Sequence, residues 1–148
     1  MHSIQATFTA LALCAVAASS ALAQSDFAHV AAKESGAKVT ASGLVFRSLQ
    51  DGQGASPSAT DKVKVHYRGT FPDGKEFDSS YKRNQPIDFP LNAVIPCWTE
   101  GVQLMKVGGK AKLTCPPGIA YGARGAGGVI PPNATLQFEV ELIAIAGR

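Results

Sequence analysis

The sequence is poor in the residues that carry metal and covalent chemistry. Its 148 residues contain three histidines and three cysteines, and no Cys-x-x-Cys pair is present. Only His66, Cys97 and Cys115 fall in the part expected to form the main domain, and these are too few for a four-ligand zinc site. No glycine-rich run ends in Gly-Lys-Ser or Gly-Lys-Thr, which excludes a phosphate-binding loop. We therefore expect neither a metal nor a cofactor.

A serine nucleophile is also poorly supported. Ser79 and Ser80 would need a neighbouring base, and strand alternation places His66 on the solvent side, opposite Tyr67. Asp78 precedes the two serines, and a lone Asp near a turn is usually a backbone cap. Alternatively, its carboxylate orients a neighbouring side chain or faces the carbonyl of a bound amide.

Neither sign of charge is in large excess. The chain has 14 Lys and Arg against 11 Asp and Glu, a net charge of +3. Lys62 and Lys64 alternate with valines, and Lys110 and Lys112 flank Ala111. This spacing is typical of the solvent side of strands, so we expect no nucleic-acid partner.

Residues 1–23 are predicted to be a cleaved signal peptide. The run from Ile4 to Ala18 carries no Lys, Arg, Asp or Glu, and Ala21-Leu22-Ala23 has the small-x-small pattern of a cleavage site. The run is shorter than the roughly 20 apolar residues of a membrane span, so we expect no stable span. Lipid attachment at Cys14 is the alternative. We expect export to a periplasm, or otherwise to a secretory lumen.

Residues 24–42 are polar and alanine-rich, and are predicted to form a flexible arm or at most one short helix. Residues 43–148 are expected to form one domain. In an oxidising compartment, Cys97 and Cys115 are candidates for a disulfide bond. The alternative is two buried thiols, because cysteine often acts as a small core residue.

The domain is predicted to be α+β. Strand composition at residues 44–49 and alternating apolar residues at 62–68, 110–115 and 136–142 predict strands. Ile87 and Phe89, between Pro86 and Pro90, predict an edge or bulged strand. Trp98, Val102 and Met105, at positions i, i+4 and i+7, predict one short helix that ends before Gly108-Gly109. Together, these strands and this helix predict a bent antiparallel sheet wrapped around one short α-helix.

Several aromatic side chains share the inward phase of these elements: Tyr67, Phe89, Trp98 and Phe138. The simplest interpretation is a hydrophobic core. That interpretation leaves unexplained the stretch 116–132, where Tyr121 precedes a glycine-rich run and Val129-Ile130 follow it. We favour a flap that carries Tyr121, Val129 and Ile130 over an apolar hollow.

Five motifs, taken in order, resemble the FKBP-type peptidyl-prolyl cis-trans isomerases, the immunophilin family. They are Val65-His66-Tyr67-Arg68-Gly69, Asp73-Gly74-Lys75-Glu76-Phe77-Asp78-Ser79-Ser80, Val94-Ile95-Pro96-Cys97-Trp98, Ala120-Tyr121-Gly122, and the stretch Ile130-Pro131-Pro132-Asn133-Ala134-Thr135-Leu136-Gln137-Phe138. The resemblance spans residues 40–145. It implies a bent sheet around one short helix, a pocket with Trp98 as its floor, and catalysed rotation about X-Pro bonds without a cofactor.

The resemblance and the flap interpretation together predict the site. The residues expected to act on the twisted amide are Tyr67, Phe77, Asp78, Ile95, Trp98, Tyr121 and Phe138. Those expected to bind the rest of the substrate are Arg83, Ile87, Val94, Val129 and Ile130. The implied partners are proline-containing polypeptides, with rapamycin-like macrolides as inhibitors, and we expect a monomer. The alternative function is a holdase chaperone that binds proline peptides in the same groove without significant turnover.

Overall fold

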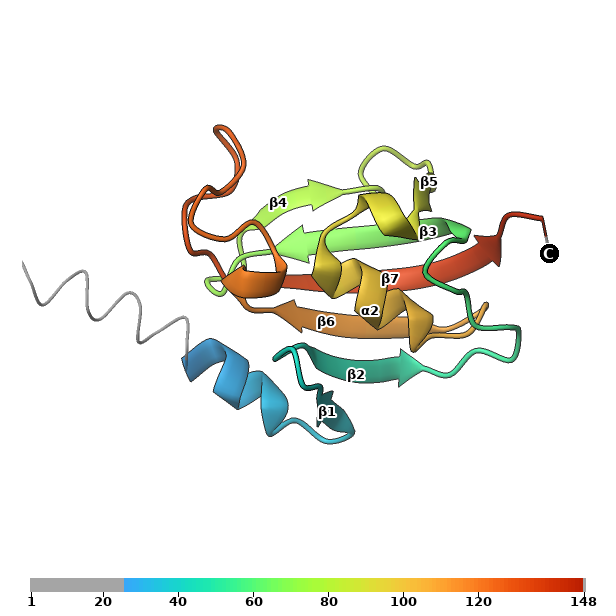
Figure 1. The fold of residues 1–148 in the computed structure, drawn as a ribbon, viewed down its shortest axis with the longest axis horizontal. Coiled ribbons are helices and arrows are strands. Elements are labelled where there is room, and N and C mark those ends of the chain that lie inside the picture. Colours follow the sequence, from blue (N-terminus) through green and yellow to red (C-terminus); the bar gives the residue numbers. More distant parts are fainter. Residues whose placement is uncertain (1–25, 148) are drawn as a thin grey trace, which may run out of the picture.

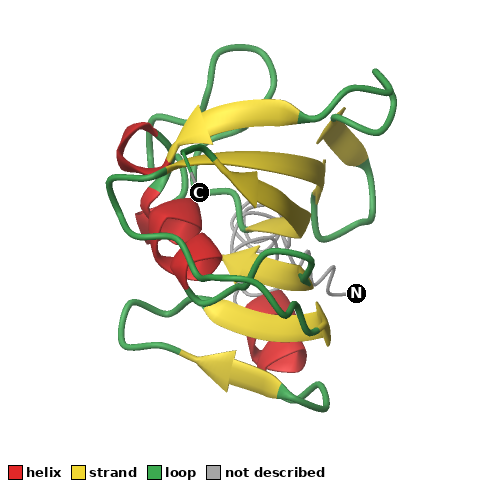
Figure 2. Ribbon diagram, turned by 90° about the vertical axis from the view of Figure 1, so that its right-hand side faces the viewer, coloured by secondary structure: helices red, strands yellow, loops and turns green. Residues whose placement is uncertain are grey.

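The computed structural model describes residues 26–147. In this part of the chain seven strands form one antiparallel sheet, with helix α2 against one face (Figures 1 and 2). The strands are β1 Ala37–Val39, β2 Val45–Gln50, β3 Lys62–Thr70, β4 Glu76–Ser79, β5 Ile87–Pro90, β6 Lys110–Cys115 and β7 Leu136–Ile145. The helices are α2 Pro96–Gln103, the short 3-10 helices η1 Leu91–Ala93 and η2 Pro117–Ile119, and a helical segment at residues 26–32. The predicted α+β fold is confirmed.

The sheet order is β1-β2-β6-β7-β3-β4, and β5 also pairs with β3. One edge of β3 pairs with β7, and β4 and β5 divide the other edge between them. β4 takes residues 68–70 of β3, and β5 takes residues 62–65. Between these two pairings, His66 and Tyr67 of β3 have no strand partner on this edge. The chain leaves the sheet there, next to a pocket.

The core lies between the sheet and α2. Strand alternation turns Leu136, Phe138, Val140 and Leu142 of β7 inward, and all four are buried. α2 buries Trp98 and Val102 against this face. The helix can lie close to β6 because Gly101 has no side chain: a Cβ there would be 2.9 Å from Leu113 Cδ1.

The start of α2 is fixed by local chemistry and by a cross-link. Pro96 occupies the first turn, where its locked φ suits a helix and its missing N–H costs no hydrogen bond. The Thr99 hydroxyl donates to the Leu91 carbonyl (2.6 Å) and ties α2 to η1. Cys97 and Cys115 form a disulfide bond that joins α2 to the end of β6. These contacts fix the orientation of Trp98, the residue after Cys97.

The segment before residue 43 contains one short helix, which the prediction allowed, and a strand that was not predicted. Residues 26–32 are helical, and β1 pairs with β2, so the sheet begins before the expected domain start. Glu34 anchors the segment because it pairs with Arg47 (2.6 Å) and Lys112 (3.0 Å) on the face of the sheet away from α2. The predicted signal peptide at residues 1–23 lies outside the described residues.

One further prediction needed correction, and strand β4 was missed. α2 ends at Gln103, so Met105 lies beyond the helix, although its side chain is still buried. β4 was not predicted as a strand, because turn residues surround its four positions and only the pairing with β3 makes it one. No helix within residues 26–147 combines the length and apolar character needed to cross a bilayer.

Candidate active site

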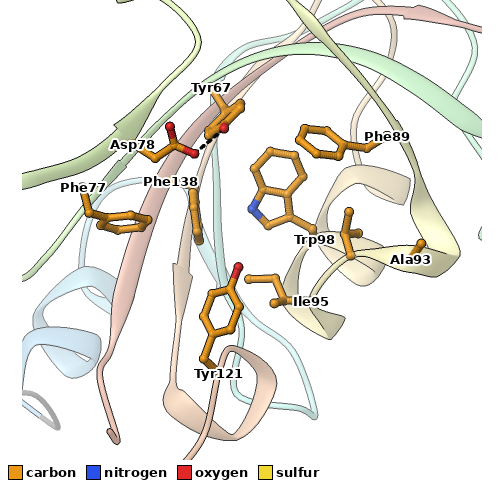
Figure 3. A pocket seen from close by; sticks show the side chains of 10 residues that line it. Tyr67, Phe77, Asp78, Phe89, Ala93, Ile95, Trp98, Tyr121 and Phe138 are labelled. Atoms are coloured by element: carbon orange, nitrogen blue, oxygen red, sulfur yellow. Dashed lines mark hydrogen bonds between the residues drawn. The ribbon is translucent and has the colours of Figure 1, made fainter. Parts of the chain in front are cut away.

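A pocket of about 480 Å³ opens between the start of α2, strands β3, β4, β5 and β7, and the chain after η2 (Figure 3). These six segments, together with η1, which carries Ala93, surround one hollow. Its lining residues are Tyr67, Phe77, Asp78, Phe89, Ala93, Val94, Ile95, Trp98, Tyr121 and Phe138. The walls are mainly apolar, and Asp78 is the one carboxylate among them.

Trp98 forms the floor of the pocket and is held by three neighbouring rings. Tyr67, Phe89 and Phe138 each meet it nearly at right angles, with centroids 5.3, 5.5 and 5.4 Å away. Edge-to-face contacts of this kind stabilise an aromatic pair beyond simple burial. Trp98 is only 4% exposed, so the indole is a fixed surface rather than a mobile side chain.

Phe77 and Phe138 form a second wall, which depends on a glycine. Their rings meet edge-to-face at 5.6 Å. Gly69 of β3 lies opposite Phe138 of β7 and opposite Asp78 of β4 in the strand register. A Cβ at Gly69 would lie 2.5 Å from Phe77 Cζ and 3.0 Å from Phe138 Cε1. Both rings can therefore occupy these positions only because residue 69 lacks a side chain.

The polar side of the pocket is a closed network of three side chains. The Tyr67 hydroxyl donates a short hydrogen bond to Asp78 Oδ2. Arg83 donates from Nη1 to Asp78 Oδ1 (2.8 Å) and from Nη2 to the Tyr67 hydroxyl oxygen (3.2 Å). The Ser79 backbone N–H also donates to Asp78 Oδ1 (2.8 Å). Both carboxylate oxygens are thus engaged, which makes Asp78 a poor general base.

The electrostatics of this network favour an ionised Asp78 beside a neutral Tyr67. Burial alone would raise the pKa of the Asp78 carboxyl, but the hydrogen bonds from Arg83 and Tyr67 and the guanidinium charge outweigh it and lower the pKa. Burial, followed by the hydrogen bond to Asp78, raises the pKa of the Tyr67 hydroxyl. Tyr67 therefore remains a donor throughout the physiological range.

This arrangement predicts how Asp78 titrates. Because its folded pKa is lowered, the carboxylate stabilises the fold at neutral pH, and that contribution is lost as pH falls below about 4 and through the folded pKa. Carboxyl ¹³C shifts followed by NMR should give a midpoint below the ordinary Asp value. Arg83→Ala should raise the midpoint, and an unchanged midpoint in that variant would contradict the network.

The pocket rim offers two hydrogen-bond donors. Tyr121 is 41% exposed, and its hydroxyl points into the pocket (Figure 3). Ile95 is the N-cap residue of α2, and its backbone N–H precedes the helix. Among residues 26–147, neither donor has a hydrogen-bond partner within the chain. Both could therefore receive carbonyl oxygens of a bound polypeptide.

The structure brings most of the predicted residues together. All seven residues predicted to act on the amide line the pocket, and Val94 does so as well. Arg83 reaches the pocket through Asp78 rather than through its wall. Phe89 and Ala93 line the pocket but were not predicted. The inward phase of Phe89 was a signal that could have identified it, whereas Ala93 gave none.

Three predicted substrate contacts are not at the pocket wall: Ile87, Val129 and Ile130. Ile130 is 7% exposed and packs in the core, because its N–H and carbonyl both pair with Ala126 and turn the loop inward. Val129 is 55% exposed at the tip of the same loop. Ile87 packs against the core from β5. Their contact with substrate stays a prediction.

The structure does not support Ser80 as a nucleophile activated by His66. His66 Nδ1 does lie 2.8 Å from Ser80 Oγ, and His66 is half-buried rather than fully on the solvent side. However, Ser80 is fully buried, and its hydroxyl accepts the Tyr67 backbone N–H (2.8 Å). A substrate cannot reach this oxygen.

Comparison with known proteins agrees with this geometry. Residues 53–143 match the family model described as FKBP-type peptidyl-prolyl cis-trans isomerase. The chain is 59% identical over 114 residues to the FKBP-type peptidyl-prolyl cis-trans isomerase FkpA of Aeromonas hydrophila, covering 77% of this chain and 42% of that protein. It is 54% identical over 114 residues to the FKBP-type 22 kDa peptidyl-prolyl cis-trans isomerase of Escherichia coli K12, covering 77% and 55%. The chain thus spans about half the length of these curated relatives.

Solved structures give the same result. FkpA from Escherichia coli has a TM-score of 0.83 at 46% identity, covering 88% of this chain and 61% of that one. The peptidyl-prolyl cis-trans isomerase of Pseudomonas syringae has a TM-score of 0.79 at 42% identity, covering 86% and 94%. With the sheet, the ring-lined pocket and the matched motifs in agreement, the chain belongs to the FKBP-type peptidyl-prolyl cis-trans isomerase family.

Proposed function

We propose that the protein is a peptidyl-prolyl cis-trans isomerase that stabilises the twisted X-Pro amide without covalent attack. Amide resonance sets a barrier of roughly 18–20 kcal/mol, and uncatalysed exchange takes tens to hundreds of seconds. At the twisted state the resonance is lost, so the amide is less polar and loses less when it leaves water. The observation that carries the proposal is the mainly apolar pocket over Trp98, which favours the twisted form over the planar one.

Eight of the ten lining residues have a proposed role that follows from their position. Trp98, Tyr67, Phe138 and Val94 hold the proline ring. The Ile95 N–H and the Tyr121 hydroxyl receive substrate carbonyls on either side.

Phe77 and Asp78 flank the carbonyl as it rotates. Arg83 acts on substrate only through Asp78, whose charge it holds in place. No proton is transferred in this mechanism, so it requires neither a free general base nor a nucleophile.

A protease-coupled assay on an X-Pro peptide tests the proposal. Phe77→Ala and Tyr121→Phe should each lower kcat/KM about fivefold to tenfold, as expected from the loss of one ring contact or one hydrogen bond. Leu49→Ala is the control, because Leu49 is 40% exposed on β2 and does not line the pocket. Full activity in both site variants would show that the assignment is wrong. A wild-type protein that suppresses aggregation without accelerating isomerisation would be a holdase instead.

The proposal extends to the ligands of the pocket and to the compartment in which the protein acts. We propose proline-containing polypeptides as substrates and rapamycin-like macrolides as competing ligands of the same pocket. We also propose that the protein acts as a monomer. Residues 1–23 are proposed to direct export to a periplasm and to be removed, which leaves the segment 24–42 and the isomerase domain that follows it. The Cys97–Cys115 disulfide supports an oxidising compartment.

A further inference from the structure

The break between β4 and β5 leaves a short piece of the β3 edge without a strand partner, and Ser80 fills it. The Ser80 N–H donates to the Tyr67 carbonyl (3.0 Å), and Ser80 Oγ accepts the Tyr67 N–H (2.8 Å). Ser80 is fully buried, so water cannot satisfy these groups in its place. His66 Nδ1 lies 2.8 Å from the same hydroxyl. Ser80 is thus the fixed base of the turn that follows it.

That turn carries Arg83 to the pocket. The Ser80 carbonyl accepts the backbone N–H groups of Arg83 (3.2 Å) and Gln85 (3.3 Å). Asn84 adopts a φ of 53°, in the left-handed region that a tight turn requires. Arg83 leaves this turn toward the pocket side and reaches Asp78. Its side chain is 48% exposed, so few packing contacts of its own hold it there.

Tyr81 holds the other side of the turn, on the face of the sheet opposite the pocket. Its ring stacks on His66, with centroids 4.6 Å apart and planes 13° from parallel. Its hydroxyl donates to Glu141 Oε2 (2.9 Å), and Glu141 lies opposite His66 in the β3–β7 register. Burial, together with the hydrogen bond to Glu141, raises the pKa of Tyr81 to about 12. The donor is therefore present at all physiological pH values.

We propose that Tyr81, seated on His66 and Glu141, is a positioning residue for the pocket: it fixes the turn after Ser80 so that Arg83 stays on Asp78 and Tyr67. The inference deepens the proposed function and rests on it. An exposed arginine on a loose turn would spend much of its time away from Asp78, because long side chains have many rotamers of similar energy. The contacts of Tyr81 remove that freedom from the opposite side of the sheet.

A double-mutant cycle between Tyr81 and Arg83 tests this coupling. Tyr81→Ala and Arg83→Ala should each lower kcat/KM about fivefold, as expected from the loss of a stacked ring or a hydrogen bond. The double variant should be no worse than Arg83→Ala alone, because Tyr81 acts only through Arg83. Tyr81→Phe keeps the stacked ring and should recover most of the activity. Ile143→Ala, 36% exposed on the same face of β7, is the matched control and should retain wild-type activity.

A second measurement follows the Asp78 carboxyl by NMR and needs no activity. Tyr81→Ala should raise its titration midpoint, as is also expected for Arg83→Ala. Multiplicative losses in the double variant, or a midpoint unmoved by Tyr81→Ala, would overturn the proposal. If the wild type shows no isomerase activity, the proposed function fails, and the Asp78 midpoint alone then decides whether Tyr81 holds Arg83.

Discussion

Gly69→Ala is expected to lower kcat/KM on the order of 100-fold, since displacements of about 1 Å near a reacting group can have effects of this size. The added methyl group would overlap the Phe77 ring and press on Phe138. Both rings must move, and they form the wall against which the substrate carbonyl is proposed to turn. The free energy of unfolding should fall by only about 1–3 kcal/mol, as is typical of overpacking. The expected signature is therefore a folded protein with a poorly shaped pocket.

Gly118→Ala provides the matched control for this prediction. Gly118 does not adopt a positive φ, and nothing lies within 4 Å of a Cβ built there. Its replacement should leave both activity and stability close to wild type. The measurement is protease-coupled isomerisation together with thermal unfolding of both variants. If Gly69→Ala were as active as Gly118→Ala, the ring wall would not contribute to catalysis.

Removing the Cys97–Cys115 bond should produce the largest loss of stability. The two residues are 18 apart in sequence, and closing a loop of that size stabilises a fold by roughly 3 kcal/mol through restriction of the unfolded chain. Both side chains are fully buried, so Cys97→Ala/Cys115→Ala is preferable to serine, which would bury unpaired hydroxyls. The unfolding midpoint should fall by about 10 °C.

The reduced wild-type protein is the control for the double alanine variant. The wild type, refolded after reduction, should unfold near the midpoint of the double alanine variant. At temperatures well below its unfolding midpoint, the double alanine variant should keep most of the wild-type activity. Thr99 and the three rings around Trp98 still orient α2 when the disulfide is absent. An unfolding midpoint unchanged by reduction would contradict the prediction.

Elements with long, regular patterns could be predicted from the sequence. The alternation in β7 and the i, i+4 spacing of Trp98 and Val102 reflect burial on one face, which is a local property. β1 and β4 lack such a pattern. The three exposed or half-buried residues of β1 become a strand only because β2 offers them hydrogen bonds. The four residues of β4, which turn residues surround, do so only because of β3. Strands that form only through such tertiary pairing show no periodic pattern of apolar residues in the sequence.

The pocket was predictable where motif and inward phase agreed, as for Tyr67, Trp98 and Phe138, whereas Phe77 was predicted from its motif alone. It was not predictable where loop geometry decides. Ile130 and Val129 are neighbours in sequence, yet a bridge to Ala126 buries one and exposes the other. The contribution of Ser80 was hidden as well, because it depends on where two strands stop along β3 rather than on its own neighbours.

Trp98 is the only tryptophan in the sequence. Indole emission from this protein therefore comes from one ring at the bottom of one pocket, with no background from elsewhere. A molecule that settles on that ring displaces water from its face and changes its emission directly. Unlabelled protein can thus report occupancy in an ordinary fluorimeter, and the proposed peptide and macrolide ligands can be tested for binding before any turnover is measured.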